Sequence, residues 1–533
     1  MPSYLPLPPS PLSTSPYPSF LYPSPPPSGK PCCSQGGGRR HKTKVAILGG
    51  GVSGIASAKV LLQEYGISDF VILEARHELG GRAQDTKIGQ TTIERGCNWI
   101  QGLGENPIWK LAQKWGLENV EQDYSDLVTY DTSGLVNDTV VMQRYDKLFE
   151  SLGEYAANRS EQGRVDLTVK AASGILGWVP TTPVEKIYEY YNIDFETAEP
   201  PQVCSFYNAL GNTEGGFAPG NNLVLDPRGF KYIFQQEAYS FLDQGGKRDP
   251  RVHYDTLVTE VRYGQEGVEV VTDKGTIFEA DYAISTFSVG VLQNHDVRFL
   301  PELPEWKREA IYAFDMATYT KIFLHFPSQF WGDEQYMLWA DPDVRGRYGI
   351  WQNLNAPGFL PRNGSENIFF VTVTDSEAYR VESMSDQEVQ DELMQLLRSI
   401  YGNDIPDPDD FYMPRWTKDP LFRGSYSNWP VGELEGHHQN LRAPLLDRLH
   451  FTGEAMSAPY FGFLQGAWLE GESTARAVGQ CLVKGDASCP SYEYHVELDV
   501  CEQPTSFTKR TGGYGRWPKA RDQTPDDGYE RSG

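Results

Sequence analysis

Residues 44–82 read KVAILGGGVSGIASAKVLLQEYGISDFVILEARHELGGR. An apolar run ends at Gly49-x-Gly51-x-x-Gly54, and a helical pattern then leads to a second apolar run that ends before Glu74. This order predicts a strand, a tight turn, a helix, a second strand and an acid. Such glycines let the backbone approach a pyrophosphate, and the helix N-terminus offers free N–H groups to its phosphates. The acid can accept hydrogen bonds from the ribose hydroxyls. We therefore predict dinucleotide binding, with a purely structural turn as the alternative.

The segment directly after this acid carries a second pair of glycines. Gly80 and Gly81 bring the backbone close to a ligand again, and the guanidinium of Arg82 is a donor fork suited to phosphate. This doublet resembles that of two-domain flavoprotein oxidases, and NAD enzymes usually lack it. The pattern therefore favours FAD over NAD.

The size and charge of the chain limit its class. A chain of 533 residues is too long for one compact core, so two domains are expected. The net charge of −25 argues against nucleic-acid binding, and it suits either a cationic substrate or solubility alone. No stretch of 18 or more apolar residues occurs, so no membrane span is predicted.

The two ends of the chain differ from its middle. Residues 1–43 are rich in Pro and Ser and should be disordered, and residues 484–533 should form a mostly irregular tail. No basic segment followed by an apolar one opens the chain, so we expect a cytoplasmic protein by default. If the first residues are misassigned, the protein could instead be extracellular.

The seven cysteines include no CxxC pair, so we predict neither a zinc site nor another metal site. Cys481, Cys489 and Cys501 lie close together in the sequence. They could form one disulfide, or they could be free thiols.

Three apparent strands in the middle of the chain read as a sheet that returns to the nucleotide. They cover Val252–Val261, Val268–Thr272 and Ile277–Ser285, and Val258 lies where the backbone could meet an adenine. Near the C-terminus, Glu454 follows another apolar run and precedes glycines, where its carboxylate can accept a ribose or ribityl hydroxyl.

A lysine lies within a strongly alternating apolar segment, residues 316–327. Ile322, Leu324 and Phe326 share one face of the predicted strand, and Tyr319 and Lys321 lie on the other. The lysine could be half of an ion pair at a sheet edge or a snorkelling side chain. It could also be a buried ammonium, or a lysine of lowered pKa, that positions a water beside a flavin.

These segments together resemble the flavin-containing polyamine oxidases of the monoamine-oxidase superfamily, of the plant and fungal type. The matching motifs are GGGVSGIASA, ILEARHELGGR, GCNWIQG, DFETAEPP, DPRGF, DMATYTKIFLHFP, GSYSNWPVG and FTGE followed by YFGFLQGA. They run in order from Lys44 to about Val483 and cover most of the chain.

The resemblance implies non-covalent FAD and a set of residues around it. The predicted FAD contacts are Gly49, Gly51, Gly54, Glu74, Arg76, Arg82, Trp99, Val258, Trp416, Glu454, Phe463 and Leu464. The predicted catalytic and substrate residues are Lys321, Tyr426, Phe463, Glu196, Gln101 and Tyr319. In this scheme Lys321 holds a water against flavin N5, and Tyr426 and Phe463 present the amine to the flavin.

The chain departs from the resemblance in the lining of the substrate tunnel. Gln101 stands where the plant relatives have a glutamate, so Glu196 is the one matched acid. An amide can hydrogen-bond an amine but cannot pair with an ammonium. Phe195 and Phe463 also replace tyrosines, which makes the tunnel more apolar. A less charged or acetylated amine would suit it, although Gln101 could equally be a variation without consequence.

The resemblance also implies an α/β fold with two domains. A discontinuous, Rossmann-like FAD domain takes residues 44–123, 221–312 and 424–483, and a substrate domain with a mixed sheet takes residues 124–220 and 313–423.

The predicted activity is FAD-dependent oxidation of a polyamine C–N bond by oxygen, giving an aldehyde, a shorter amine and hydrogen peroxide. We expect a monomer or weak dimer that acts on a small-molecule amine. Two alternatives remain: a flavin oxidase for another amine, such as a secondary-metabolite intermediate, and a non-catalytic escort protein of the same fold.

Overall fold

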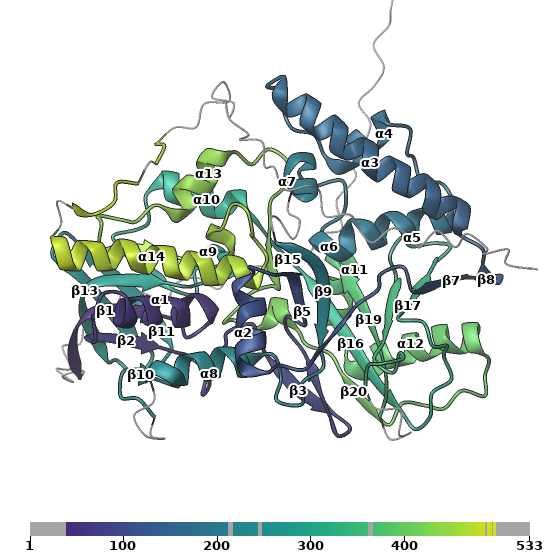
Figure 1. The fold of residues 1–533 in the computed structure, drawn as a ribbon, viewed down its shortest axis with the longest axis horizontal. Helices are drawn as coiled ribbons and strands as arrows, with labels where there is room; N and C mark the ends of the chain where they lie inside the picture. Colours follow the sequence, from purple (N-terminus) through teal and green to yellow (C-terminus); the bar gives the residue numbers. More distant parts are fainter. Residues whose placement is uncertain are drawn as a thin grey trace, which may run out of the picture. The chain divides into compact units, whose positions relative to one another are not determined.

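Two large sheets organise the residues that the structure describes (Figure 1). The structure is a computed structural model, and it describes residues 39–211, 217–242, 248–360, 366–485, 488–492 and 494–496. The predicted disorder of the N-terminus and most of the predicted C-terminal tail lie outside these residues.

The first sheet has eight strands in the order β10-β2-β1-β13-β12-β11-β14, with β22 paired to the end of β13. Its strands are β1 (Arg40–Leu48), β2 (Phe70–Leu73), β10 (Val252–His253), β11 (Val258–Gly264), β12 (Gly267–Thr272), β13 (Ile277–Ser285), β14 (Arg298–Leu300) and β22 (Leu449–Phe451). Strand β1 runs parallel to β2 and β13, and β22 runs parallel to β13. The carboxyl ends of these four strands therefore share one edge, which is where α/β sheets bind ligands.

Two boundaries differ from those expected. Strand β1 begins at Arg40, four residues before the predicted start of the folded part at Lys44. The predicted single strand Val252–Val261 is wrong, because it contains two strands, β10 and β11, near opposite edges of the sheet. The chain turns between them at Asp255, whose φ is +50°.

Helices cover this sheet, and two of them meet closely. They are α1 (Val52–Gln63), α2 (Pro107–Trp115), α8 (Lys231–Leu242), α9 (Val289–Gln293), α10 (Glu305–Ala313), α13 (Glu435–Arg442) and α14 (Leu464–Lys484). Helices α1 and α14 lie side by side (Figure 1). A Cβ on Gly471 would lie 2.3 Å from the Ser53 carbonyl oxygen, and the Ser57 hydroxyl donates to the Gly471 carbonyl. Only glycine therefore permits this crossing.

The second sheet has seven strands in the order β20-β16-β19-β18-β17-β7-β8. They are β7 (Leu127–Asp131), β8 (Gly134–Val136), β16 (Tyr319–Phe326), β17 (Tyr336–Trp339), β18 (Ile350–Asn353), β19 (Asn367–Thr374) and β20 (Asp410–Tyr412). Its helices are α3 (Thr139–Glu161), α4 (Val169–Ile175), α5 (Pro183–Asn192), α6 (Asp194–Thr197), α7 (Phe206–Gly211), α11 (Asp375–Ser383) and α12 (Asp386–Tyr401). The alternation predicted for β16 is confirmed, since Ile322, Leu324 and Phe326 share one core cluster and Phe323 belongs to another.

Short elements join the two sheets. They are β3 (Asp85–Ile88) with β4 (Thr91–Glu94), β5 (Trp99–Leu103) with β9 (Ala218–Val224) and β6 (Asn119–Glu121), β15 (Asp315–Ala317) with β21 (Tyr426–Asn428), and the 3₁₀ turns η1 (Trp416–Lys418) and η2 (Glu454–Met456). Apart from residues 40–43, the strands of each large sheet fall within the segments predicted for the FAD and substrate domains. The domain boundaries themselves stay predictions.

Three further features bear on the predictions. A Cys481–Cys489 disulfide is present, and Cys501 lies outside the described residues. None of the helices that the structure describes combines the length and apolarity needed to cross a membrane. Within the same residues, no three His, Cys, Asp or Glu side chains are grouped so that they could hold a metal ion.

One buried carboxyl group has no hydrogen-bond partner among the described residues. The Glu433 side chain is 0% exposed, and neither carboxyl oxygen is bonded. The nearest ring nitrogen, Nδ1 of His437, lies 3.9 Å away and accepts a hydrogen bond from the Leu434 N–H. Burial therefore raises the pKa of Glu433 well above its usual range.

We expect Glu433→Gln to stabilise the protein increasingly as pH rises from about 5 to 8. Because the folded-state pKa is raised, the favourable contribution of Glu433 is present below its unfolded pKa and is lost as pH rises toward the folded one. An amide does not ionise, so the variant should gain about 1–3 kcal/mol at the upper end. Thermal unfolding of both proteins across this range measures it, and a gain that does not change with pH would contradict the assignment.

Candidate active site

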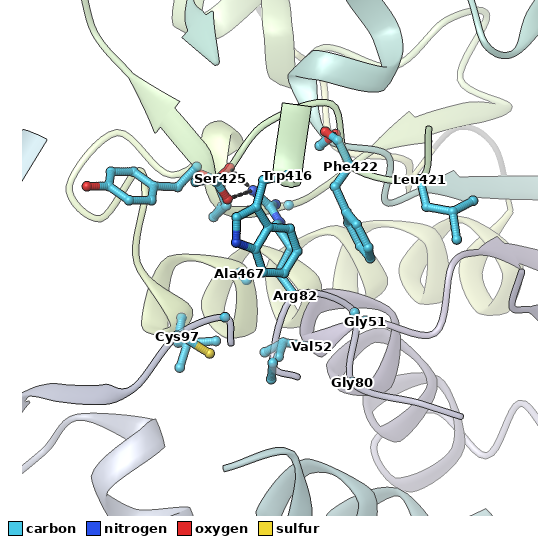
Figure 2. A pocket seen from close by; sticks show the side chains of 18 of the residues that line it. Gly51, Val52, Gly80, Arg82, Cys97, Trp416, Leu421, Phe422, Ser425 and Ala467 are labelled. Atoms are coloured by element: carbon cyan, nitrogen blue, oxygen red, sulfur yellow. Dashed lines mark hydrogen bonds and ion pairs between the residues drawn. The ribbon is translucent and has the colours of Figure 1, made fainter. Parts of the chain in front are cut away.

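A cavity of about 390 Å³ lies at the carboxyl edge of the first sheet and extends to β16 and β21 (Figure 2). Its volume is in the range of ligand-binding pockets. Residues that lie one or two positions after β1, β2, β13 and β22 line it, namely Gly49, Glu74, Thr286 and Gly453. The parallel strands therefore deliver four separate segments to one site.

Glycine backbone forms one end of the cavity. A Cβ on Gly49, whose φ is +119°, would lie 2.2 Å from Thr286 Oγ1. A Cβ on Gly81 would lie 3.0 Å from the Gly51 Cα, and Gly51 forms a β-bridge with Gly80. No side chain caps the N-terminus of α1, so its first N–H groups are available to a ligand. This cradle fits the pyrophosphate of a dinucleotide.

Gly54 and Arg76 do not line the cavity. A Cβ on Gly54 would lie 2.1 Å from the Gly49 carbonyl oxygen, so this glycine lets α1 pack against the turn. The Arg76 guanidinium donates to Glu78 and to the Gly81 carbonyl. Both residues shape the cradle from behind it, and their direct contact with a cofactor stays a prediction.

The predicted ribose-binding acid lies where expected. Glu74 lines the cavity and accepts hydrogen bonds from the N–H groups of Gly50 at 2.7 Å and Arg76 at 2.8 Å. Burial raises the pKa of Glu74. Val258, at the start of β11, lines the same end of the cavity.

Arg82, which is partly buried, and Glu454, which is buried, form an ion pair on the cavity wall. Arg82 Nη1 donates to Glu454 Oε1 at 2.9 Å and to the Ser425 carbonyl at 3.0 Å (Figure 2). Glu454 also accepts from the Ser427 hydroxyl at 2.5 Å and from the Gly462 N–H at 2.7 Å. The two residues thus hold each other in place, and their contacts with a cofactor stay predictions.

Lys321 lines the cavity from β16 and is buried. Its Nζ donates to the carbonyls of Glu94 at 2.6 Å and Gly96 at 2.5 Å, and to Asn98 Oδ1 at 3.1 Å. Burial lowers the pKa of Lys321 below its usual range and raises the pKa of the nearby Glu94 carboxyl. Glu94 and Asn98 were missed in the sequence, although they lie in and next to the GCNWIQG motif.

Aromatic rings surround the cavity beyond Lys321. The rings of Tyr319 and Tyr426 lie 6.0 Å apart between centroids, and Phe195 lies 5.8 Å from Tyr319 and 6.0 Å from Trp99. Phe463, Leu464 and Trp416 also line the cavity, and Trp416 meets Phe422 edge to face at 5.5 Å (Figure 2). Tyr124, which was missed in the sequence, completes this aromatic chamber.

The aromatic chamber, residues 99, 124, 195, 319, 426 and 463, contains one carboxylate. The acids that line the whole cavity are Glu74, Glu196, Asp296 and Glu454. Glu74 lies at the glycine end of the cavity, and Glu454 lies in the cavity wall. The Arg423 guanidinium donates two hydrogen bonds to the Asp296 carboxylate, at 2.7 and 2.6 Å. Glu196 and Gln101 line the chamber, so its acidic side chain is Glu196 and its amide is Gln101.

The fold and the cavity define a flavin-dependent amine oxidoreductase. Residues 52–479 match the sequence model of the flavin containing amine oxidoreductase family, and the chain belongs to this family. It is therefore an enzyme, an FAD-dependent amine oxidase, and not an escort protein.

Plant polyamine oxidases are among its relatives. Polyamine oxidase 1 of Zea mays is 37% identical over 85% of this chain and 93% of its own length. Polyamine oxidase 7 of Oryza sativa subsp. japonica is 37% identical over 81% of this chain and 93% of its own length. The structure of putrescine oxidase bound to putrescine superposes with a TM-score of 0.66 at 18% identity, over 82% of this chain and 99% of that chain, which supports the two-domain fold.

We expect Lys321→Met to slow reduction of the bound flavin by an amine roughly tenfold or more, without loss of the flavin, because a proton-holding group beside the reaction is removed. The rate of anaerobic flavin bleaching in a stopped-flow spectrometer measures this effect.

Lys307 provides the matched control, since it too is fully buried. Its Nζ donates to the carbonyls of Asn440, Leu441 and Ala443, and it does not line the cavity. Lys307→Met should lower the unfolding temperature and leave the bleaching rate per bound flavin unchanged. If Lys321→Met instead releases the flavin, the role of Lys321 is structural.

Proposed function

We propose that this enzyme oxidises a C–N bond of a polyamine, such as spermine, spermidine or an acetylated form. The products would be an aldehyde, a shorter amine and hydrogen peroxide. One observation carries the proposal: the cavity that starts at the glycine cradle ends in an aromatic chamber with a single carboxylate. Its plant relatives at 37% identity are polyamine oxidases, which supports the same substrate class.

The glycine cradle, Glu74, Arg82 and Glu454 would hold FAD. Bound FAD supplies the acceptance of two electrons from the amine and their transfer to oxygen. The protein's own task is to bind and orient the amine and to exclude water.

The chamber residues divide this task. The rings of Tyr319, Tyr426 and Phe463 would surround the reacting nitrogen. This nitrogen would be neutral, because burial among apolar rings disfavours its ammonium form. Glu196 would accept the ammonium of a more distant amine on the same substrate. Lys321, whose pKa burial lowers, would hold a proton or release it more readily than an exposed lysine does.

Gln101 favours a substrate with few charges. A chamber with one carboxylate neutralises one distant ammonium, and an amide in place of a second acid cannot pair with another. An acetylated polyamine, or a different amine of low charge, would therefore be accepted better than fully charged spermine. The second candidate function is that of a flavin oxidase that acts on a different amine of low charge.

We expect anaerobic mixing with spermine, spermidine and N1-acetylspermine to bleach the yellow protein, fastest with the acetylated amine. The bleaching rate should rise from pH 7 toward mild alkalinity, because only the neutral amine reacts. Air should then restore the yellow colour with release of hydrogen peroxide. A yellow protein that none of the three bleaches would refute a polyamine substrate, and a flat pH profile would contradict the requirement for a neutral amine.

We expect Gln101→Glu to raise kcat/KM for spermine relative to N1-acetylspermine by about tenfold, since a hydrogen bond to a charged group contributes about 1.5–3 kcal/mol. Steady-state peroxide assays with both amines measure the ratio. Gln101→Met, similar in size and uncharged, is the control and should leave the ratio nearly unchanged. Equal ratios for Gln101→Glu and the wild type would show that residue 101 does not sense substrate charge.

A further inference from the structure

The short helix α6 carries both Phe195 and Glu196 into the aromatic chamber. With four residues, Asp194–Thr197, it is too short to be stable by itself. Contacts with the rest of the protein must therefore set the position of the Glu196 carboxylate.

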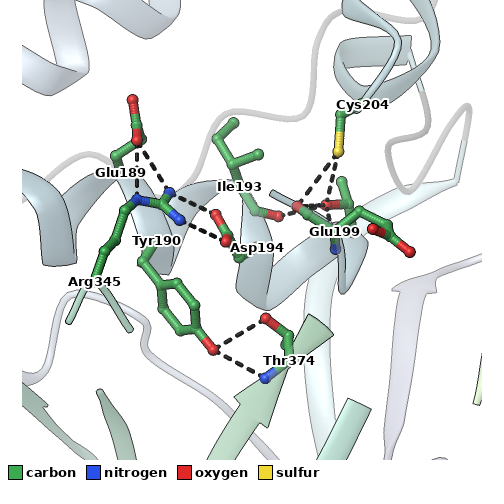
Figure 3. Close-up of polar contacts among 9 residues, drawn as sticks. Glu189, Tyr190, Ile193, Asp194, Glu199, Cys204, Arg345 and Thr374 are labelled. Atoms are coloured by element: carbon green, nitrogen blue, oxygen red, sulfur yellow. Dashed lines mark hydrogen bonds and ion pairs between the residues drawn. The ribbon is translucent and has the colours of Figure 1, made fainter. Parts of the chain in front are cut away.

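An arginine from the loop between β17 and β18 anchors the start of α6. Nη1 and Nη2 of Arg345 each donate to one carboxylate oxygen of Asp194 at 2.6 Å, and Nε donates to Glu189 at 3.1 Å (Figure 3). Both acids are buried, and burial raises the pKa of Asp194 to about 6. A planar guanidinium fixes direction as well as distance in such a bidentate pair.

Close packing fixes the position of the loop that carries Arg345. A Cβ on Gly346, whose φ is +79°, would lie 2.1 Å from the Tyr190 ring, so only glycine lets the loop approach α5. The Arg345 guanidinium lies 5.4 Å from the centre of the same ring. The Tyr190 hydroxyl in turn accepts from the N–H and hydroxyl of Thr374 at 3.0 Å (Figure 3). The anchor is therefore rigid.

The other end of α6 is bonded toward the cofactor side of the chamber. The Tyr426 hydroxyl, from β21, donates to the Glu196 carbonyl at 3.1 Å. Cys204 Sγ lies 3.3 Å from Thr197 Oγ1 and accepts from Asn428 Nδ2 at 3.7 Å. Helix α6 is thus held between Arg345 on one side and β21 on the other.

We propose that Arg345 is a positioning residue for substrate charge: it holds α6 so that Glu196 meets the distant ammonium of the amine. This inference rests on the proposed function and deepens it. Arg345 itself does not line the cavity, so it acts through Asp194 and the helix.

The test compares spermine with N1,N8-diacetylspermidine, whose terminal nitrogens are uncharged amides and whose single amine is the one that reacts, in steady-state peroxide assays. Arg345→Lys keeps the charge and loses the fork, so kcat/KM for spermine should fall about tenfold, mainly through KM, from the displaced carboxylate. The kcat/KM for the diacetyl substrate should change less than about twofold, because this substrate has no second amine whose ammonium could meet Glu196. In a Glu196→Gln background, Arg345→Lys should have no further effect on spermine.

Arg251 is the matched control. Arg251 lies away from the cavity and donates two hydrogen bonds to the Asp249 carboxylate, at 2.9 and 2.6 Å. The side chains of Arg251 and Asp249 are 17% and 2% exposed, and those of Arg345 and Asp194 are 20% and 3% exposed. Arg251→Lys should show the same change in unfolding temperature and flavin content and no change in substrate ratio. If Arg345→Lys yields no folded protein, Asp194→Asn makes the same comparison from the other partner.

Two results overturn the inference in different ways. If Glu196→Gln separates the two substrates but Arg345→Lys affects both equally, Arg345 is merely structural and the proposed function stands. If Glu196→Gln treats both substrates alike, or the wild type oxidises neither, the proposed function fails and the inference fails with it.

Discussion

The buried carboxylate of Glu454 is the interaction on which the cavity depends. It accepts from Arg82, from the N–H and hydroxyl of Ser427, and from the Gly462 N–H. These donors come from the segment after β2, from β21 and from the segment before α14, and Arg82 lies 372 residues before Glu454 in the chain. A carboxylate with several charge-assisted or backbone donors is stable inside a protein, whereas the same donors without it would be buried and unpaired. Its bonds join the glycine cradle to the aromatic chamber.

The two buried lysines are also held by several hydrogen bonds, but they lie in different surroundings. Lys307 and Lys321 are both buried, and each donates to three oxygen atoms. Lys307 satisfies the last carbonyls of α13, which a helix leaves without partners, so it completes a helix end. Lys321 instead donates to oxygen atoms of a loop at the edge of the cavity. A change in its protonation would therefore change the electrostatic environment of a ligand in the cavity. The same side chain in the same degree of burial thus completes a helix end in one place and lies beside the cavity in the other.

The sequence predicted the parts of the site that are continuous in the chain. The β1–α1–β2 order, Glu74 and the alternation around Lys321 each have a local pattern, and each was found in the structure at the predicted place. The fork between Arg345 and Asp194 has none, because 151 residues separate the partners and neither lies in a periodic segment. Likewise, Val252–Val261 reads as one strand because only the backbone at Asp255 shows where the chain turns.

Acidity of the whole chain and acidity of the site are separate properties. The net charge of −25 resides mostly on the surface, where water and salt screen it, so it can attract cationic amines without selecting among them. Selection requires a carboxylate whose position is fixed and whose surroundings exclude water. Under the proposed function this carboxylate is Glu196, which lies on a helix too short to be stable by itself and among aromatic rings. How finely the enzyme distinguishes amines should therefore depend less on how many acids it has than on how rigidly the fold holds this one.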